Sequence, residues 1–241
     1  MLITLAGMIG VGKSSLSKMT GELLSTPVEY EPVVDNPVLP LYYADPKQYA
    51  FLLQIYFLNM RFDMIKRAMY IKNGVLDRSI YEDALFTRQN YLDGNLQEAE
   101  LATYKHLLRN MLQEIETLPK KAPDLMIYLK ADFETVITQI KRRGRPYEQG
   151  TDKYDYYRAL LDRYDEFELE YDASPMLVVD TVDLDFVNNK HDYQTIMLQI
   201  IKALHTVGTL TDEQSQHYHD VVDPERNMND IKITMRDNRK R

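Results

Sequence analysis

A glycine-rich segment near the N-terminus has the residue types and the spacing that bind phosphate groups. Residues 7–14 read GMIGVGKS and match the pattern G-x-x-x-x-G-K-[ST]. Glycines let successive backbone N–H groups turn inward onto phosphate oxygens, and a following helix adds the positive end of its dipole. Lys13 then reaches the β- and γ-phosphates, and the Ser14 hydroxyl is placed to coordinate Mg²⁺. The segment therefore predicts a nucleoside triphosphate site made of Gly7, Met8, Ile9, Gly10, Val11, Gly12, Lys13, Ser14 and Ser15.

Two acidic positions follow short apolar runs farther along the chain. Glu31 comes after the run at 28–30, and Asp77 ends the run at 75–77, directly before Arg78. A carboxylate at position 77 can hold Mg²⁺ directly or through water, as the second acidic element of a P-loop site does. Alternatively, Asp77 caps the next helix, Arg78 is a surface charge and Glu31 is a solvated carboxylate.

A basic segment lies in the second half of the chain. Residues 141–145 read KRRGR, with Glu148 just beyond. Basic residues at the C-terminus of a helix offset its dipole, so one or two of them need no functional explanation. Four cations around a glycine favour a lid over a transferring phosphoryl group, in which Arg143 or Arg145 acts as an arginine finger.

These residues fall at the ends of alternating strand and helix patterns. We expect strands at 2–6, 28–30, 75–77, 125–129 and 176–179. Helices are expected up to residue 24 and at 45–72, 79–91, 96–118, 132–143, 154–171 and 192–205. Such an order predicts an α/β, three-layer fold of the P-loop NTPase type, with a five-stranded parallel sheet flanked by helices and an arginine-rich lid. Ligands bind beyond the carboxyl ends of strands in such sheets, which is where the candidate residues fall.

The composition limits the class of protein. The chain has 241 residues, no cysteine and a net charge of −8, which argues against broad binding to nucleic acid or to an anionic membrane surface. No apolar run approaches a membrane span, and the first residues lack the basic region of a signal peptide. We therefore expect a cytoplasmic protein. Residues 206–241 are mostly polar and read as a solvated extension of unknown role.

The chain resembles the deoxynucleoside kinase family, specifically its bacterial deoxyadenosine/deoxyguanosine kinase branch. The resemblance covers residues 1–204 and rests on the segments GMIGVGKSSL, EYEPVVDNPVLPLYY, FLLQIYFLNMRF, LDRSIYEDALF and KRRGRPYEQ. It implies a kinase domain at 1–205 with a lid at about 142–150, followed by the extension at 206–241. It also implies transfer of the γ-phosphoryl group of ATP to the 5′-hydroxyl of a deoxynucleoside, most simply a purine one, in nucleotide salvage.

The resemblance assigns roles around the reacting atoms. Glu31 corresponds to the base that accepts the 5′-hydroxyl proton, and Arg78 to the arginine that holds the same oxygen and the γ-phosphate. Asp77 corresponds to the carboxylate associated with Mg²⁺, although the sequence leaves open which of Glu31 and Asp77 takes the proton. Lys13 and the lid arginines Arg143 and Arg145 complete the catalytic set.

Further matched positions bind the nucleoside. Tyr43 and Glu148 match the pair that binds the 3′-hydroxyl of the sugar. Gln54, Arg61 and Asp83 match the residues that read the base edge. Gln54 and Arg61 lie seven positions apart and so share one face of the expected helix 45–72.

The family also suggests a cofactor, a partner and an inhibitor. Mg²⁺ accompanies ATP, and the chain forms a homodimer, or a heterodimer with a related subunit, through helices such as 45–72 and 96–118. The apolar positions of these helices could equally form intramolecular core. Feedback inhibition by a deoxynucleoside triphosphate is a further expectation.

Two alternatives stay open. One is a nucleotide kinase of the thymidylate kinase type, although Tyr30 stands where that family typically shows an arginine. Such an enzyme needs a cation for the phosphate of its acceptor, because that phosphate would be repelled by Glu31. The other is a catalytically silent regulatory subunit on the same scaffold.

Overall fold

A six-stranded sheet forms the centre of the computed structural model, which describes residues 1–31, 36–71, 73–117 and 122–239. The order of strands is β2-β3-β1-β4-β5-β6, and the first five are parallel while β6 runs antiparallel to β5. The strands are β1 (Leu2–Gly7), β2 (Val28–Glu29), β3 (Gly74–Asp77), β4 (Leu125–Lys130), β5 (Met176–Asp180) and β6 (Thr234–Arg236).

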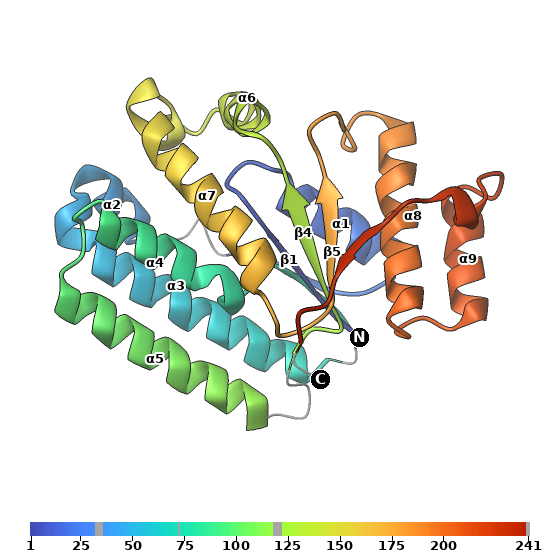
Figure 1. Ribbon diagram of the computed structural model, residues 1–241, viewed down its shortest axis with the longest axis horizontal. Helices are drawn as coiled ribbons and strands as arrows, with labels where there is room; N and C mark the ends of the chain where they lie inside the picture. Colours follow the sequence, from blue (N-terminus) through green and yellow to red (C-terminus); the bar gives the residue numbers. More distant parts are fainter. Residues whose placement is uncertain (32–35, 72, 118–121, 240–241) are drawn as a thin grey trace.

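Helices cover both faces of the sheet. Figure 1 shows α3, α4, α5 and α7 together on one side, and α1, α8 and α9 on the other. The three-layer α/β fold is therefore confirmed. The helices are α1 (Lys13–Leu23), α2 (Leu39–Ala44), α3 (Pro46–Met69), α4 (Asp83–Leu92), α5 (Glu98–Thr117), α6 (Phe133–Arg143), α7 (Tyr154–Glu170), α8 (Lys190–Thr206) and α9 (Asp212–Val222).

Local sequence explains where these elements begin and end. The apolar runs of β1 and β3 are buried along their whole length, as strands covered on both faces must be. The side chain of Asp45 accepts a hydrogen bond from the backbone of Gln48 at 3.2 Å and so caps α3, whose first residue is a proline. Gly144 adopts a left-handed conformation (φ 68°) that ends α6.

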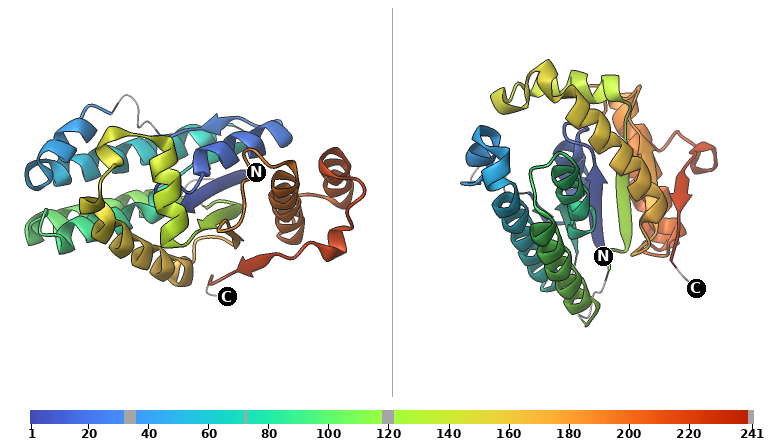
Figure 2. Two further views of the ribbon diagram at one scale, coloured as in Figure 1. Left: turned by 90° about the horizontal axis from the view of Figure 1, so that it is seen from above. Right: turned by 60° about the vertical axis from the view of Figure 1, so that its left-hand side comes forward.

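The sheet and the C-terminal residues differ from expectation. The strand β6 makes the sheet six-stranded and mixed, whereas five parallel strands were expected. The described part of the expected extension, residues 206–239, is not a solvated tail, because α9 packs on α8 and Ile231 is buried in the main core. Figure 2 shows the C-terminal segment running along this side of the molecule to the edge of the sheet. The strand β6 could not be predicted from an apolar pattern, because its residues are mostly polar and it buries little of its own surface.

Smaller differences occur around α3 and α4. The short helix α2 was not expected, and the helix predicted at 79–91 is a 3-10 turn (Ile80–Glu82) followed by α4. The predicted helix ends at residues 72 and 118 lie outside the described residues, as do positions 32–35 of one segment that carries the family resemblance.

The two helices expected to form a dimer interface pack on each other within the chain. Leu58, Ile65 and Ala68 of α3 join Tyr104 and Ile115 of α5 in one buried cluster. These apolar positions therefore serve the intramolecular core. In the part of the chain that the structure describes, no helix is long and apolar enough to cross a membrane.

Candidate active site

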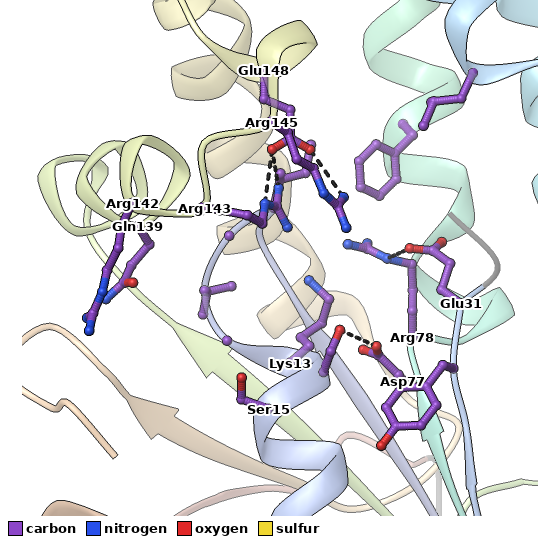
Figure 3. Close-up of a pocket in the computed structure, with 18 of the residues that line it drawn as sticks. Lys13, Ser15, Glu31, Asp77, Arg78, Gln139, Arg142, Arg143, Arg145 and Glu148 are labelled. Atoms are coloured by element: carbon purple, nitrogen blue, oxygen red, sulfur yellow. Dashed lines mark hydrogen bonds and ion pairs between the residues drawn. The ribbon is translucent and has the colours of Figure 1, made fainter. Parts of the chain in front are cut away.

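One cavity of about 590 Å³ opens at the carboxyl ends of the parallel strands. The glycine-rich loop after β1 lines one end of it, and side chains from α2, α3 and α4 line the other. Figure 3 shows Lys13, Asp77, Arg78 and Glu31 gathered in its middle, with the lid arginines above them. The strand register explains this gathering, because Asp77 lies opposite Leu5, two residues before the loop begins.

The glycine-rich loop has the backbone of a phosphate cradle. Gly10 and Gly12 have positive φ angles of 87° and 102°, and a Cβ on Gly12 would lie 2.7 Å from the ring of Phe186. Only glycine fits that position without strain. The Lys13 ammonium donates hydrogen bonds to the carbonyl oxygens of Gly7 and Met8, at 2.7 and 2.8 Å. Burial and the nearby Arg78 lower the pKa of Lys13 to about 7, against the opposing effect of Glu82 and other carboxylates.

The oxygen atoms suited to Mg²⁺ lie beside this loop. The Ser14 hydroxyl donates a hydrogen bond to the Asp77 carboxylate. Burial raises the pKa of Asp77, while Lys13 and Ser14 oppose that rise. A hydroxyl and one carboxylate fit Mg²⁺, which prefers oxygen ligands and keeps several water or phosphate oxygens of its own. The residues present therefore fit the metal expected with ATP.

Glu31 is held by two arginines on the opposite side of the cavity. It accepts a hydrogen bond from Arg78 Nε at 3.1 Å and another from Arg61. Burial alone would raise the pKa of Glu31, but Arg61 and Arg78 outweigh it and lower the pKa to about 2. Glu31 is therefore ionised at neutral pH. It lies beside Arg78, which is expected to bind the same 5′-oxygen of the nucleoside.

The residues expected to read the base occupy the far end of the cavity. Arg61 forms ion pairs with Glu31 and with the fully buried Asp83. The hydroxyl of Thr87 donates to Gln54 Oε1 at 3.2 Å. Gln54 and Arg61 line the cavity, whereas Asp83 stands behind Arg61 and does not. The carboxylate of Asp83 thus orients the guanidinium of Arg61. A guanidinium has N–H donors and no acceptor, so a ligand at this position must offer an acceptor.

Two arginines of the lid form ion pairs with a carboxylate of the same lid. Arg143 donates to Glu148 Oε2 from Nε at 3.0 Å and from Nη2 at 2.5 Å, and Arg145 Nη1 lies 3.5 Å from Oε1. The ring of Tyr147, also in the lid, stacks on Tyr43 of α2, with ring centres 4.7 Å apart. Figure 3 shows the two arginines meeting Glu148 above Lys13. Basic and acidic residues that were predicted separately are therefore paired here.

Most of the predicted site residues meet in this cavity. The exceptions are Gly7 and Met8, which face Lys13 through their carbonyls, and Asp83. The sequence reasoning missed two groups of lining residues. Those on the acceptor side are Tyr30, Leu39, Tyr42, Leu53, Phe57, Phe86, Asn90 and Tyr156, and those beside the loop are Thr135, Gln139, Thr181, Leu184, Asp185, Phe186 and Val187, whereas Arg142 belongs to the predicted lid.

One signal could have found part of the missed set. Residues 181–187 follow β5, and the carboxyl end of a parallel strand is where ligands bind. The aromatic residues of α3 and α4 carry no such signal, because ordinary core positions have the same spacing.

Comparisons with known proteins show which family the chain resembles in sequence and in fold. A family model described as deoxynucleoside kinase matches residues 3–206. A deoxyguanosine kinase of Lactobacillus acidophilus is 49% identical over 212 residues, which cover 87% of this chain and 93% of that protein. A deoxyadenosine kinase of the same species is 43% identical over 212 residues, covering 87% and 99%.

A solved structure shares the fold as well as the sequence pattern. The deoxyadenosine kinase of M. mycoides with bound dATP aligns with a TM-score of 0.71 at 33% identity, covering 83% of this chain and 99% of that one. The family model spans more than half of the chain, including the glycine-rich loop, Glu31, Arg78 and the lid. The chain therefore belongs to the deoxynucleoside kinase family.

Proposed function

We propose that this ATP-dependent kinase phosphorylates the 5′-hydroxyl of purine deoxynucleosides, in nucleotide salvage. The position of Glu31 carries the proposal. It stands with Arg78 between the phosphate loop and the base-reading residues of one cavity, where an acceptor hydroxyl must meet a phosphoryl donor. The similarity to kinases named for deoxyguanosine and deoxyadenosine supports the purine class.

Glu31 is the proton acceptor in this proposal. A carboxylate with a pKa of about 2 is a weak base, so it gains basicity when an arginine leaves it. In the proposal Arg61 releases Glu31, keeps its ion pair with Asp83 and turns its remaining donors to the base edge. Asp77 accepts a hydrogen bond from Ser14 of the phosphate loop, which favours a role for Asp77 at Mg²⁺ and the phosphates rather than at the acceptor hydroxyl.

The remaining residues position the reactants and stabilise charge. Lys13 moves from the loop carbonyls to the β- and γ-phosphates, and Arg78 holds the acceptor oxygen. Ser14 and Asp77 would hold Mg²⁺, which when bound offsets charge on the phosphates. Arg143 and Arg145 reach the transferring group, while Glu148 and Tyr43 bind the 3′-hydroxyl. Rate acceleration then comes mainly from positioning and electrostatics.

The polar groups at the base end favour guanine among the purines. Thr87 donates a hydrogen bond to Gln54 Oε1, so the amide turns its NH₂ group to the cavity. Arg61 likewise offers only hydrogen-bond donors. Guanine offers two acceptors, O6 and N7, on one edge, whereas adenine offers a donor beside its N7. We therefore expect deoxyguanosine to be preferred over deoxyadenosine.

A substrate panel tests the proposal. Purified protein with Mg²⁺ and ATP is assayed against deoxyguanosine, deoxyadenosine, deoxycytidine, thymidine and dTMP. The expected kcat/KM is highest for deoxyguanosine, followed by deoxyadenosine. Turnover of a pyrimidine nucleoside alone would overturn the purine assignment, and turnover of dTMP alone would identify a nucleotide kinase. ATP binding with no turnover of any acceptor would identify a silent subunit.

The dimer and the cytoplasmic location belong to the same proposal. Exposed Leu52 on α3 and Leu92 at the end of α4 are apolar positions that a second subunit could cover. Light scattering of the purified protein should give a mass near twice 28.3 kDa. A mass of one chain would contradict the dimer and leave the catalytic assignment intact.

A further inference from the structure

A buried carboxylate behind the cavity accepts two hydrogen bonds and forms an ion pair through one oxygen atom. Glu82 Oε2 accepts from the Gly7 N–H at 3.2 Å and from the Tyr164 hydroxyl at 2.6 Å, and lies 3.1 Å from Arg78 Nη1. Arg78 Nη1 also donates to the Tyr164 oxygen at 2.8 Å. Glu82 and Tyr164 are completely buried, and neither is among the described residues that line the cavity.

These contacts join the donor and acceptor sides of the site. Gly7 ends β1 and opens the phosphate loop, whereas Arg78 follows β3 and reaches Glu31 through Nε at 3.1 Å. Tyr164 comes from α7, beyond the lid in sequence. One carboxylate therefore sets the distance between the beginning of the loop and the arginine that faces the acceptor.

The guanidinium of Arg78 has little freedom left. Its Nε and Nη1 atoms are used by Glu31, Tyr164 and Glu82, and within the described residues no hydrogen bond or ion pair uses Nη2. The backbone of Arg78 also has a φ of 82°, which is uncommon for a residue with a side chain. Such a conformation persists where the surroundings determine it, as these contacts do here.

We propose that Glu82 and Tyr164 are positioning residues for phosphoryl transfer, and that they act by fixing Arg78 relative to the phosphate loop. The proposal deepens the proposed function, because it rests on the role assigned there to Arg78. Arg78 Nη2 then faces the reacting oxygens in a single orientation. No rearrangement of the guanidinium is needed when the substrates meet.

The charges of the group suit this role. Burial lowers the pKa of Arg78, but Glu82, Tyr164 and Glu31 outweigh it, so the guanidinium stays charged. Burial raises the pKa of Tyr164 well above its ordinary value, so its hydroxyl stays protonated and can donate to Glu82. The group therefore keeps one arrangement of donors and acceptors at neutral pH.

A double-mutant cycle between Tyr164→Phe and Arg78→Lys tests the proposal. Tyr164→Phe removes one hydroxyl and keeps the ring, and kcat should fall about tenfold with KM for both substrates within about twofold. In the Arg78→Lys background the same change should alter kcat by less than about twofold, because the group it positions is gone. Glu82→Gln in the wild-type background should lower kcat by roughly 100-fold.

Tyr171→Phe is the matched control, since it removes another buried hydroxyl, which bonds Ser174 at 2.7 Å just after α7. It should leave kcat unchanged. Equal factors for Tyr164→Phe in both backgrounds, or unchanged kcat in the wild-type background, would overturn the proposal. The cycle is run on the best of the four deoxynucleosides. If a pyrimidine is the best substrate, the purine assignment is contradicted. The cycle still tests whether Tyr164 acts through Arg78.

Discussion

Glu31 meets both arginines of the acceptor side, and its role is the most direct assignment to test. Glu31→Gln keeps the size of the side chain but removes the carboxylate that is proposed to accept the proton. We expect kcat to fall by about 10²–10⁴, with little change in ATP binding, as measured by steady-state kinetics and calorimetry. The control is Glu29→Gln, since Glu29 pairs with Arg67 outside the cavity. Turnover near that of the wild type would move the proton acceptor to Asp77.

Lys13 should take up a proton when ATP binds. Its pKa is lowered to about 7, mainly by burial, so above pH 7 it is largely neutral. The triphosphate supplies negative charge and raises that pKa. Affinity for Mg²⁺-ATP should therefore fall as pH rises above about 7, and calorimetry at pH 8 in buffers of different ionisation enthalpy should show proton uptake.

Two variants separate this uptake from other titrations. Lys13→Met should abolish it, whereas Lys18→Met, at an exposed pair with Glu22, should not. Identical binding enthalpies in all buffers at pH 8 would contradict the prediction.

Thr87 should control base preference through Gln54. Thr87→Val removes the donor that holds Gln54 Oε1, so the amide can present either end to the base. The ratio of kcat/KM for deoxyguanosine to that for deoxyadenosine should fall by about tenfold. Thr4→Val is the control, because Thr4 is a buried threonine that bonds Met126 inside the sheet. An equal fall in kcat/KM for both nucleosides would show that Thr87 contributes only to packing and does not set the base preference.

Among the secondary-structure elements, β6 and the segment before it stabilise the edge of the sheet away from the site. Arg236 of β6 pairs with Met176 at the start of β5 and forms an ion pair with the buried Glu168 at 3.0 Å. The cavity lies at the other ends of the parallel strands, which end near the lid. Stability and catalysis should therefore respond differently to changes here.

Deleting residues 231–241 should lower stability and leave the active site intact. Exposing β5 and losing buried Ile231 should cost roughly 2–4 kcal/mol, which corresponds to a fall in Tm of about 5–10 °C for a chain of this size. KM values at low temperature should stay unchanged. Ile231→Ala gives a milder version, and Arg239→Ala, at an exposed pair with Asp237, should not change Tm. A large rise in KM without loss of Tm would contradict this division.

In the molecule as a whole, one continuous cavity joins the glycine-rich loop to the residues that are expected to read the base. The residues near its two ends, such as Lys13 and Gln54, line the same space of about 590 Å³. A deoxynucleoside triphosphate with the preferred base can therefore place its base beside Gln54 and its phosphates on the loop. Such a molecule would exclude both substrates at once.

dGTP should accordingly inhibit competitively against both ATP and the deoxynucleoside. Initial-rate kinetics at varied ATP and varied nucleoside measure the two patterns. dGMP is the control, because it lacks the phosphates that reach the loop and should compete strongly only with the nucleoside. Inhibition by dGTP that is non-competitive with the nucleoside would indicate a separate site.

The glycine-rich loop, the alternation of helices and strands, and the positions of Glu31, Asp77 and Arg78 could all be predicted from the sequence. Local chemistry decides these features, because glycines, caps and apolar periods act over a few residues. Most of the family-matched positions, from Tyr43 to Glu148, also lie in the cavity. Their assigned roles stay predictions.

Which charged side chains contact one another follows from the three-dimensional packing and could not be predicted from the sequence. Glu82 reads as part of a helix start in the sequence, yet it lies against Gly7 and Tyr164, 75 and 82 positions away. Likewise β6 has too few residues and too polar a composition to be read alone, and it becomes a strand because β5 offers an edge. Contacts between distant segments depend on how strands and helices are placed side by side, and no local pattern records that.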